Sequence, residues 1–435
     1  MQALDLSRFD DIIEQTRQSC KAALNWDVHM INKAKNTLSN SQGMGLYIHI
    51  PFCASKCAYC DFLSFEGMGE GTQRRYVDAL LREMRDARDE LGAIDTVYIG
   101  GGTPTALPSF LLCEVLEEVR QFNLSSDVEI TLEMNPCTGP YSALAGYKNL
   151  GVNRLSVGLQ AWQDHLLSGL RRGHTAGEFT QTMEAARAAG FKNINVDLMF
   201  ALPGQTMEDW QESIRLVITH APEHISTYSL TPAEGTPLWD TLESGKTQLP
   251  EDSVDRVMYH EAISLLGAAG YMHYELSNFA LPGRESQHNI DCWRRKPYRG
   301  LGLGAHSFDG GMRWRNTLDM GGYLGCWGGG DKTLCCHQTQ LAPTGAADTV
   351  CDVREDIEIL SQRDAMAEMM ILGLRMISGV RPKDFYDMFG IHLADCFGAE
   401  LERLAAKGLI VSTPNRVALT ALGLDLANQV FGAFL

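Results

Sequence analysis

The sequence predicts an α/β fold in which parallel strands alternate with helices, followed by a mostly helical C-terminal region. Six short runs typical of strands occur between residues 46 and 229, and segments with helical patterning lie between them. Consecutive βα units of this kind imply parallel strands joined by right-handed crossovers. Either an open doubly wound sheet or a complete or partial barrel satisfies the pattern.

The expected elements follow in chain order. The strands cover residues 46–50, 96–99, 128–132, 154–157, 193–199 and 224–229, and helical patterning covers 76–91, 108–121 and 176–189. Before the first strand, residues 1–43 carry apolar residues at helical spacing and end in a polar linker, which predicts an N-terminal helical extension.

The last third of the chain has a different pattern. Residues 280–350 are rich in glycine, arginine and aromatic residues and show few clear elements, whereas helical patterning resumes after Asp364. The tail from Phe385 predicts short helices, a turn at Pro414-Asn415 and a final helix. This layout resembles a winged helix.

Composition excludes some function classes. The chain has 37 Lys and Arg against 54 Asp and Glu, a formal net charge of −17, which disfavours nucleic acid as a partner. The N-terminus is acidic where a signal peptide is basic, and no run approaches the roughly 18 apolar residues of a membrane helix. We therefore expect a cytoplasmic protein, in which cysteines are more often metal ligands or catalytic groups than disulfides.

Special residues follow each expected strand. Cys53, Cys57 and Cys60 come after the first strand, and three glycines followed by Thr103 come after the second. Because the carboxyl ends of parallel strands meet at one face, we expect these residues to form one site. Glycines there let the backbone approach a ligand closely, although a simple tight turn is an alternative explanation.

The cysteine spacing indicates a metal centre. Three thiolates within eight residues can hold one corner of a 4Fe–4S cluster and leave one iron open to a small molecule. A structural zinc site is an alternative, with His49 as the nearest candidate for a fourth ligand, and unrelated free thiols are another.

These motifs resemble those of the radical S-adenosylmethionine (radical SAM) superfamily, and longer strings resemble its HemN/HemW family. The strings are LYIHIPFCASKCAYCDF at 46–62, YIGGGTPT at 98–105, RLSVGLQ at 154–160 and NVDLM at 195–199. The resemblance implies a partial (β/α)6 TIM-type barrel as a radical SAM core at 44–280 and a HemN-type C-terminal region at 281–435. It also implies that a 4Fe–4S cluster and SAM are bound, and that an electron from the cluster cleaves SAM to give a 5′-deoxyadenosyl radical.

The resemblance also implies roles for single residues. Cys53, Cys57 and Cys60 would ligate the cluster, beside Tyr47 and Tyr59. The implied SAM contacts are Gly101, Gly102, Thr103, Glu133, Gln160, Arg172, Asp197 and Thr231.

Two features favour the HemW branch, which is regarded as haem chaperones, over HemN, the oxygen-independent coproporphyrinogen III oxidase. HemN has a further cysteine where this chain has Phe62, and the segment HNIDCW at 288–293 is similar to a HemW pattern with tyrosine in place of Cys292. Candidate haem contacts are His288, Cys292, Trp293 and His306, because imidazole and thiolate are common axial ligands. A hydrogen-bonded structural role is the alternative for each histidine, and a buried substitution is the favoured interpretation of Cys292. Arg294, Arg295, Lys296 and Arg299 are candidates to bind porphyrin carboxylates.

The expected function is binding of haem and its delivery to target proteins. The alternatives are radical decarboxylation of coproporphyrinogen III and another radical SAM reaction on a small molecule. Expected partners are haem or a porphyrin, a haem-accepting protein and a reductant of the flavodoxin or ferredoxin type; a homodimer and peripheral membrane contact through a partner stay open. Cys326, Cys335, Cys336 and Cys351 have no assigned role.

Overall fold

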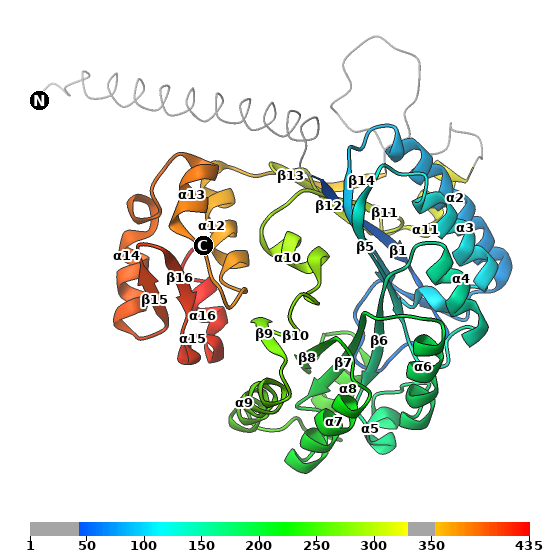
Figure 1. The fold of residues 1–435 in the computed structure, drawn as a ribbon, viewed down its shortest axis with the longest axis horizontal. Coiled ribbons are helices and arrows are strands. Elements are labelled where there is room, and N and C mark those ends of the chain that lie inside the picture. The colour runs from blue at the N-terminus through cyan, green and yellow to red at the C-terminus, as the bar shows by residue number, and fades with distance from the viewer. Residues whose placement is uncertain (1–42, 329–352) are drawn as a thin grey trace, which may run out of the picture.

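A computed structural model describes residues 43–328 and 353–435, so the predicted extension at 1–43 lies outside the described residues except for Gly43. The six expected strands form the centre of a curved sheet (Figure 1). They are β1 (Met44–Ile50), β4 (Ile94–Gly101), β5 (Leu124–Met134), β6 (Arg154–Gln160), β7 (Ile194–Phe200) and β8 (His224–Ser229), and each pairs in parallel with the next. The sheet ends at β14 (Arg354–Ile359) and β9 (Met272–Glu275) without closing, which confirms a partial barrel.

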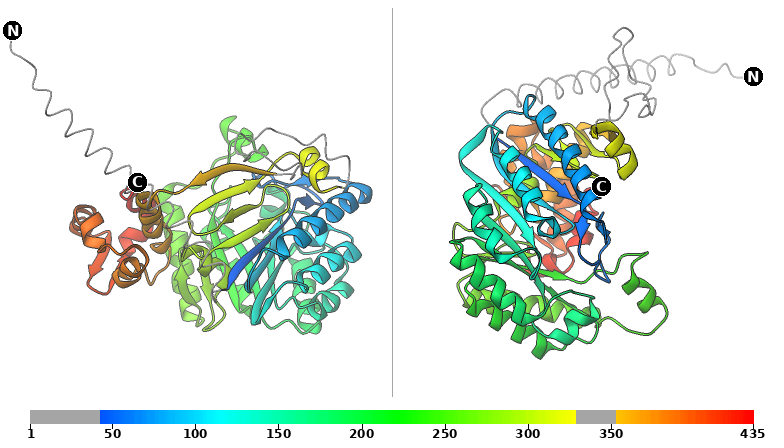
Figure 2. Two further views of the ribbon diagram at one scale, coloured as in Figure 1. Left: turned by 90° about the horizontal axis from the view of Figure 1, so that it is seen from above. Right: turned by 90° about the vertical axis from the view of Figure 1, so that its right-hand side faces the viewer.

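Helices cover the outer side of this sheet, as both views of Figure 2 show. They are α2 (Glu70–Arg88), α3 (Ser109–Val119), α4 (Leu144–Asn149), α5 (Asp164–Gly169), α6 (Ala176–Ala188), α7 (Met207–Thr219), α8 (Pro237–Glu243) and α9 (Asp252–Ala268). Capping boxes at Thr175 and Thr206 begin α6 and α7, because each threonine hydroxyl accepts from an otherwise unpaired backbone amide. The apolar faces of most of these helices pack on the sheet to form the main core, whereas α5 and α8 contribute to a smaller cluster that includes Ala58 and Leu230.

Further strands extend the sheet at both edges. β11 (Tyr298–Leu301) pairs in parallel with β1, and β12 (His306–Phe308), β13 (Met312–Asn316) and β14 (Arg354–Ile359) continue antiparallel. At the other edge, β10 (Asn278–Ala280) and β9 (Met272–Glu275) follow β8. The stretch after residue 280 therefore contains more regular structure than its sequence indicated, including α10 (Gln287–Trp293) and α11 (Met320–Trp327). The domain boundary at 280 stays a prediction.

The C-terminal region has its own core and lies to one side of the barrel (Figure 1). It consists of α12 (Gln362–Gly373), α13 (Pro382–Phe389), α14 (Leu393–Ala406), the hairpin of β15 (Ile410–Thr413) and β16 (Arg416–Leu419), α15 (Ala421–Asp425) and α16 (Ala427–Phe431). The hairpin turns at Pro414-Asn415, as expected. Three helices followed by a hairpin give the winged-helix-like layout.

One helix holds the end of β1, where the cysteine segment begins. Tyr76 on α2 is fully buried, and its hydroxyl donates to the His49 carbonyl at 2.7 Å. Two turns further on, Glu83 ties α2 to the added strands.

In the described ranges, every helix is too short or too polar to cross a membrane.

Replacing Glu83 by alanine is expected to destabilise the fold. Its carboxylate is buried and accepts from Gly302 N at 2.8 Å, Asn316 Nδ2 at 2.6 Å and Tyr323 Oη at 2.6 Å. Alanine leaves three donors buried without an acceptor, so the free energy of unfolding should fall by about 3 kcal/mol. Urea denaturation measures this, with the exposed Glu90→Ala as control; equal effects of the two changes would contradict the role given to Glu83.

Candidate cofactor site

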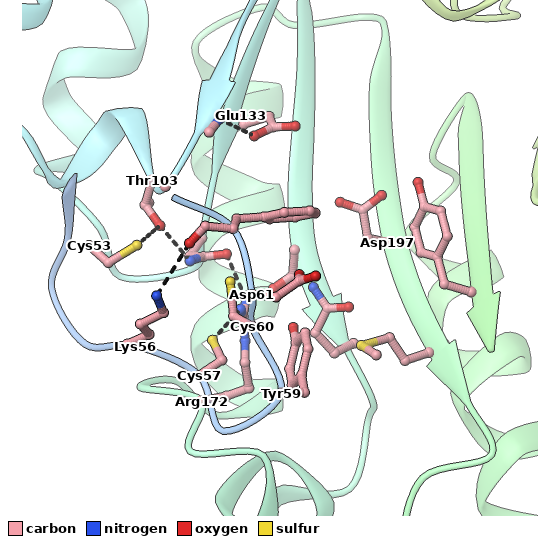
Figure 3. Close-up of a pocket in the computed structure, with 18 of the residues that line it drawn as sticks. Cys53, Lys56, Cys57, Tyr59, Cys60, Asp61, Thr103, Glu133, Arg172 and Asp197 are labelled. Carbon is pink, nitrogen blue, oxygen red and sulfur yellow. Dashed lines mark hydrogen bonds between the residues drawn. The ribbon is translucent and has the colours of Figure 1, made fainter. Parts of the chain in front are cut away.

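A cavity of about 430 Å³ lies at the carboxyl ends of the six central strands (Figure 3). Side chains from successive strand ends meet there, as the parallel arrangement predicts. The sequence-predicted residues that line it are Cys53, Cys57, Tyr59, Cys60, Gly101, Gly102, Thr103, Glu133, Gln160, Arg172, Asp197 and Thr231. Tyr47 does not line the cavity, and its hydroxyl lies 2.9 Å from His49 Nδ1.

The three cysteines lie on the segment between β2 (Phe52–Cys53) and β3 (Phe65–Glu66), and all three line the cavity. Two backbone hydrogen bonds fix the segment, from Ala58 N to Leu170 O and from Leu238 N to Ala58 O, both at 2.9 Å. Three soft sulfur donors facing one cavity suit a 4Fe–4S cluster with one open iron.

The alternative of a zinc site completed by His49 is not supported by the histidine's contacts. Its Nδ1 lies 2.9 Å from Tyr47 Oη, and its Nε2 lies 2.9 Å from the Leu63 carbonyl. Both ring nitrogens are therefore already used in hydrogen bonds, and neither is free to bind a metal.

The glycine segment runs alongside the cysteine segment. Gly102 N donates to Ile50 O at 2.9 Å, and Thr103 N donates to Phe52 O at 2.8 Å. A Cβ on Gly102 would lie 2.7 Å from Phe52 O, and one on Gly101, whose φ is +113°, would lie 2.5 Å from the His49 ring. Side chains are thus excluded, and the backbone borders the cavity directly.

Two half-buried carboxylates also line the cavity. Glu133 accepts from Tyr98 Oη at 2.7 Å and from Gly101 N at 3.2 Å, and Asp197 accepts from Asn195 Nδ2 at 2.7 Å. Burial raises the pKa of Glu133 to about 7 and also raises the pKa of Asp197. Paired but poorly hydrated carboxylates of this kind suit a ligand that brings a positive charge or hydroxyl donors.

Arg172 connects the cysteines to the strand ends. It donates from Nη1 to Cys57 Sγ at 3.2 Å and from Nη2 to Asn135 Oδ1 at 2.6 Å, and Asn135 in turn donates to Thr103 Oγ1 at 2.9 Å. Asn135 was missed as a site residue, although it stands directly after β5 at the position that the strand-end argument indicates.

Two further lining residues, Ser156 and Tyr228, were also missed. Every second residue of a strand faces the same side, and Ser156, Gly158 and Gln160 of β6 accordingly all line the cavity. The sequence shows the alternation of residues along the strand, but it does not show which of the two faces of the strand points into the cavity. Gln160 has a φ of +80°, an uncommon conformation for a residue other than glycine.

The expected haem contacts on α10 point into the protein. His288 is buried with Nδ1 2.9 Å from Thr96 Oγ1, and burial followed by the charge of Arg154 lowers its pKa to about 4. Burial raises the pKa of the Cys292 thiol to about 12, and the Arg375 guanidinium stacks 4.3 Å above the Trp293 ring.

Other predicted residues are spread over the added strands. His306 on β12 is the one exposed member of the expected haem contacts. Of the proposed porphyrin-binding cations, Arg295 pairs with Glu368 at 2.7 Å and Lys296 pairs with Asp291 at 3.0 Å, so both already have acidic partners. Cys326 is buried on α11, and Cys335, Cys336 and Cys351 lie outside the described residues.

Two family models match the chain: the radical SAM superfamily at residues 47–217 and the HemN C-terminal domain at residues 360–426. Heme chaperone HemW of Bacillus subtilis (strain 168) is 37% identical over 393 residues, which cover 89% of this chain and 98% of the relative. HemW of Lactococcus lactis is 33% identical, covering 89% and 96%. The mitochondrial radical S-adenosyl methionine domain-containing protein 1 of Mus musculus is 34% identical, covering 86% and 83%.

A solved structure shares the fold. Coproporphyrinogen III oxidase (HemN) from Escherichia coli, described as a radical SAM enzyme, superposes with a TM-score of 0.75 and covers 91% of this chain and 90% of its own. The sequences are 21% identical, so the likeness is one of fold.

The half-buried carboxylate of Glu133 should make stability depend on pH. Its pKa is about 7 in the folded chain against an ordinary 4.5, so stability is full below about pH 4.5 and falls as the pH rises through 7. We expect Glu133→Gln to gain stability relative to the original chain at about pH 8 and to lose that gain at about pH 5. Urea unfolding at both pH values measures this. The exposed Glu117→Gln should show no such difference, and a pH-independent effect of Glu133→Gln would contradict the prediction.

Proposed function

Because the chain belongs to the HemW family of the radical SAM superfamily, we propose that it is a haem chaperone that binds haem and delivers it to proteins that require it. The observation that carries the proposal is identity of 37% to a named heme chaperone over 98% of that relative's length. Phe62 supports it as well. This residue is 67% exposed at the rim of the cavity, where the HemN branch carries a further cysteine.

The cofactors of this superfamily are a 4Fe–4S cluster and SAM, and the cavity fits both. Cys53, Cys57 and Cys60 would hold three irons, which leaves the fourth for SAM. When bound and reduced, the cluster supplies the electron that cleaves SAM.

The remaining cavity residues would bind and orient SAM. The ionised Glu133 carboxylate accepts hydrogen bonds from an ammonium group, and Asp197 accepts them from ribose hydroxyls. Gly101 and Gly102 border the ligand space with their backbone, since a Cβ on either would collide with His49 or Phe52, and Arg172 donates to Cys57 Sγ.

The polar groups at the rim complete the proposed SAM site. Thr103, Gln160 and Thr231 offer polar side chains, and Tyr59 lies beside the cysteines. Tyr47 supports the site through its hydrogen bond to His49.

His306 is the proposed axial ligand of haem. It is exposed on β12, and partial burial together with Arg315 and Arg313 lowers its pKa. The imidazole is thus neutral at physiological pH, the form that binds iron. Arg313 and Arg315 also offer cations for propionates, although each has acidic neighbours.

The partners follow from this function. We propose a haem-accepting protein and a reductant of the flavodoxin or ferredoxin type, with action in the cytoplasm. A homodimer and membrane contact through the haem acceptor are compatible with the same role.

The cluster assignment predicts the effect of Cys57→Ala. Anaerobically reconstituted protein should show a 4Fe–4S charge-transfer band in its absorption spectrum, and this variant should lose it because two thiolates hold a cluster poorly. Cys113→Ala on α3, which removes a thiol outside the cavity, should keep the band. An intact band in Cys57→Ala would contradict the ligand assignment.

Haem titration tests the chaperone role. The reconstituted chain should bind haem with a Soret shift, and His306→Ala should weaken binding at least about tenfold because an axial ligand is lost. His165→Ala, which removes another exposed imidazole, should bind haem as the original chain does. Conversion of coproporphyrinogen III to protoporphyrinogen by the same preparation would favour the HemN-type reaction instead.

A further inference from the structure

A chain of buried hydrogen bonds leads from the cavity into the base of the barrel. Asp197 accepts from Asn195 Nδ2 at 2.7 Å, and Asn195 Oδ1 lies 2.6 Å from His224 Nδ1. His224 Nε2 lies 2.8 Å from Tyr274 Oη, which accepts from Ser286 N at 3.3 Å. Asn195, His224 and Tyr274 are all buried.

The direction of every hydrogen bond in this series follows from the groups at its two ends, the Asp197 carboxylate and the Ser286 amide. The carboxylate form of Asp197 can only accept, so in that form the Asn195 atom beside it is the amide nitrogen and the oxygen faces His224. His224 must then carry its proton on Nδ1, which leaves Nε2 to accept from the Tyr274 hydroxyl. At the far end, the Ser286 amide can only donate, so it agrees with the same order.

Two further observations support this order. Burial, followed by the charge of Arg154, lowers the pKa of His224 well below its ordinary value, so the ring is neutral and has one donor and one acceptor. Ser226 Oγ also donates to Asn195 Oδ1 at 3.1 Å, which is consistent with an oxygen at that position.

The Tyr274 end of this series of hydrogen bonds is held by backbone contacts with the C-terminal region. Ile377 N donates to the Tyr274 carbonyl at 3.0 Å, and Leu276 N donates to Arg375 O at 3.0 Å. Tyr274 therefore has little freedom to move, and its hydroxyl is a fixed donor to His224.

We propose that Tyr274 and His224 are positioning residues, which hold the Asp197 carboxylate in the orientation that binds SAM. Neither lines the cavity, so both act through Asn195. This inference rests on the proposed role of Asp197 as a SAM contact. Asn195 Nδ2 also donates to Ser156 Oγ at 2.8 Å, so loss of the Nδ1–H of His224 weakens, but does not abolish, the preference that keeps this nitrogen turned toward Asp197.

The test measures the dissociation constant of SAM calorimetrically on anaerobically reconstituted protein. Tyr274→Phe should weaken SAM binding about fivefold, the equivalent of one buried hydrogen bond. The matched control is Tyr271→Phe, which removes a buried hydroxyl that donates to Pro222 O at 2.6 Å outside the chain of hydrogen bonds. It should leave the SAM constant unchanged while costing comparable stability.

A pair of variants at His224 separates positioning from folding. In His224→Asn the amide nitrogen takes the place of Nδ1 and still donates to Asn195, but the contact with Tyr274 is lost, so SAM affinity should match that of Tyr274→Phe, about fivefold below the original. In His224→Gln the donor to Asn195 is misplaced as well, and affinity should fall about 25-fold, the equivalent of two hydrogen bonds. Equal affinities in these two variants, or in Tyr274→Phe and Tyr271→Phe, would overturn the inference.

Asp197→Asn distinguishes this inference from the proposed function. If it weakens SAM binding strongly while the Tyr274 and His224 variants do not, the SAM contact stands and the positioning role is wrong. If Asp197→Asn leaves SAM binding unchanged, the proposed contact is wrong and the inference fails with it.

Discussion

Carboxylates inside the open barrel must be paired, and this requirement shapes its interior. Glu133 and Asp197 lie where a closed barrel would carry branched aliphatic side chains. Glu133 is held by Tyr98 and Gly101 on the neighbouring strand β4, and Asp197 is held by Asn195 on its own strand and by the Ser156 hydroxyl on β6 at 3.4 Å. Because these partners come from different strands, the strand register and the geometry of the site are determined together. The interior therefore stays polar, and a cavity remains at the carboxyl ends of the strands.

The central fold was readable from the sequence because each strand is followed at once by residues of unusual chemistry. The cysteine and glycine segments come directly after β1 and β4, so parallel pairing alone places them together. The place of Asn135 directly after β5 indicated the site, but its role was missed because it depends on Arg172, which approaches only in the folded chain. For Tyr47, the family resemblance implied a position at the site, whereas in the structure its hydroxyl contacts His49 Nδ1 and the residue does not line the cavity.

The region after residue 280 could not be predicted because its structure depends on distant partners. β11 adds to the sheet beside β1, and a pairing of this kind leaves no local pattern. His288 is turned inward by Thr96, and Trp293 packs beneath Arg375, so two residues with suitable chemistry for haem have other roles in the folded chain. His306 differs because its side chain is exposed on β12, beside two arginines.

These observations describe a chaperone with a radical SAM core, in which the cofactor cavity and the exposed His306 lie on different parts of one sheet. Haem transfer tests this account most directly. Haem-loaded, reconstituted protein is mixed anaerobically with an apo haem protein, and the Soret bands of donor and acceptor are followed with time. The account predicts that haem leaves the chain and appears in the acceptor. Haem that stays on the chain, or reaches the acceptor no faster than free haem does, would contradict it.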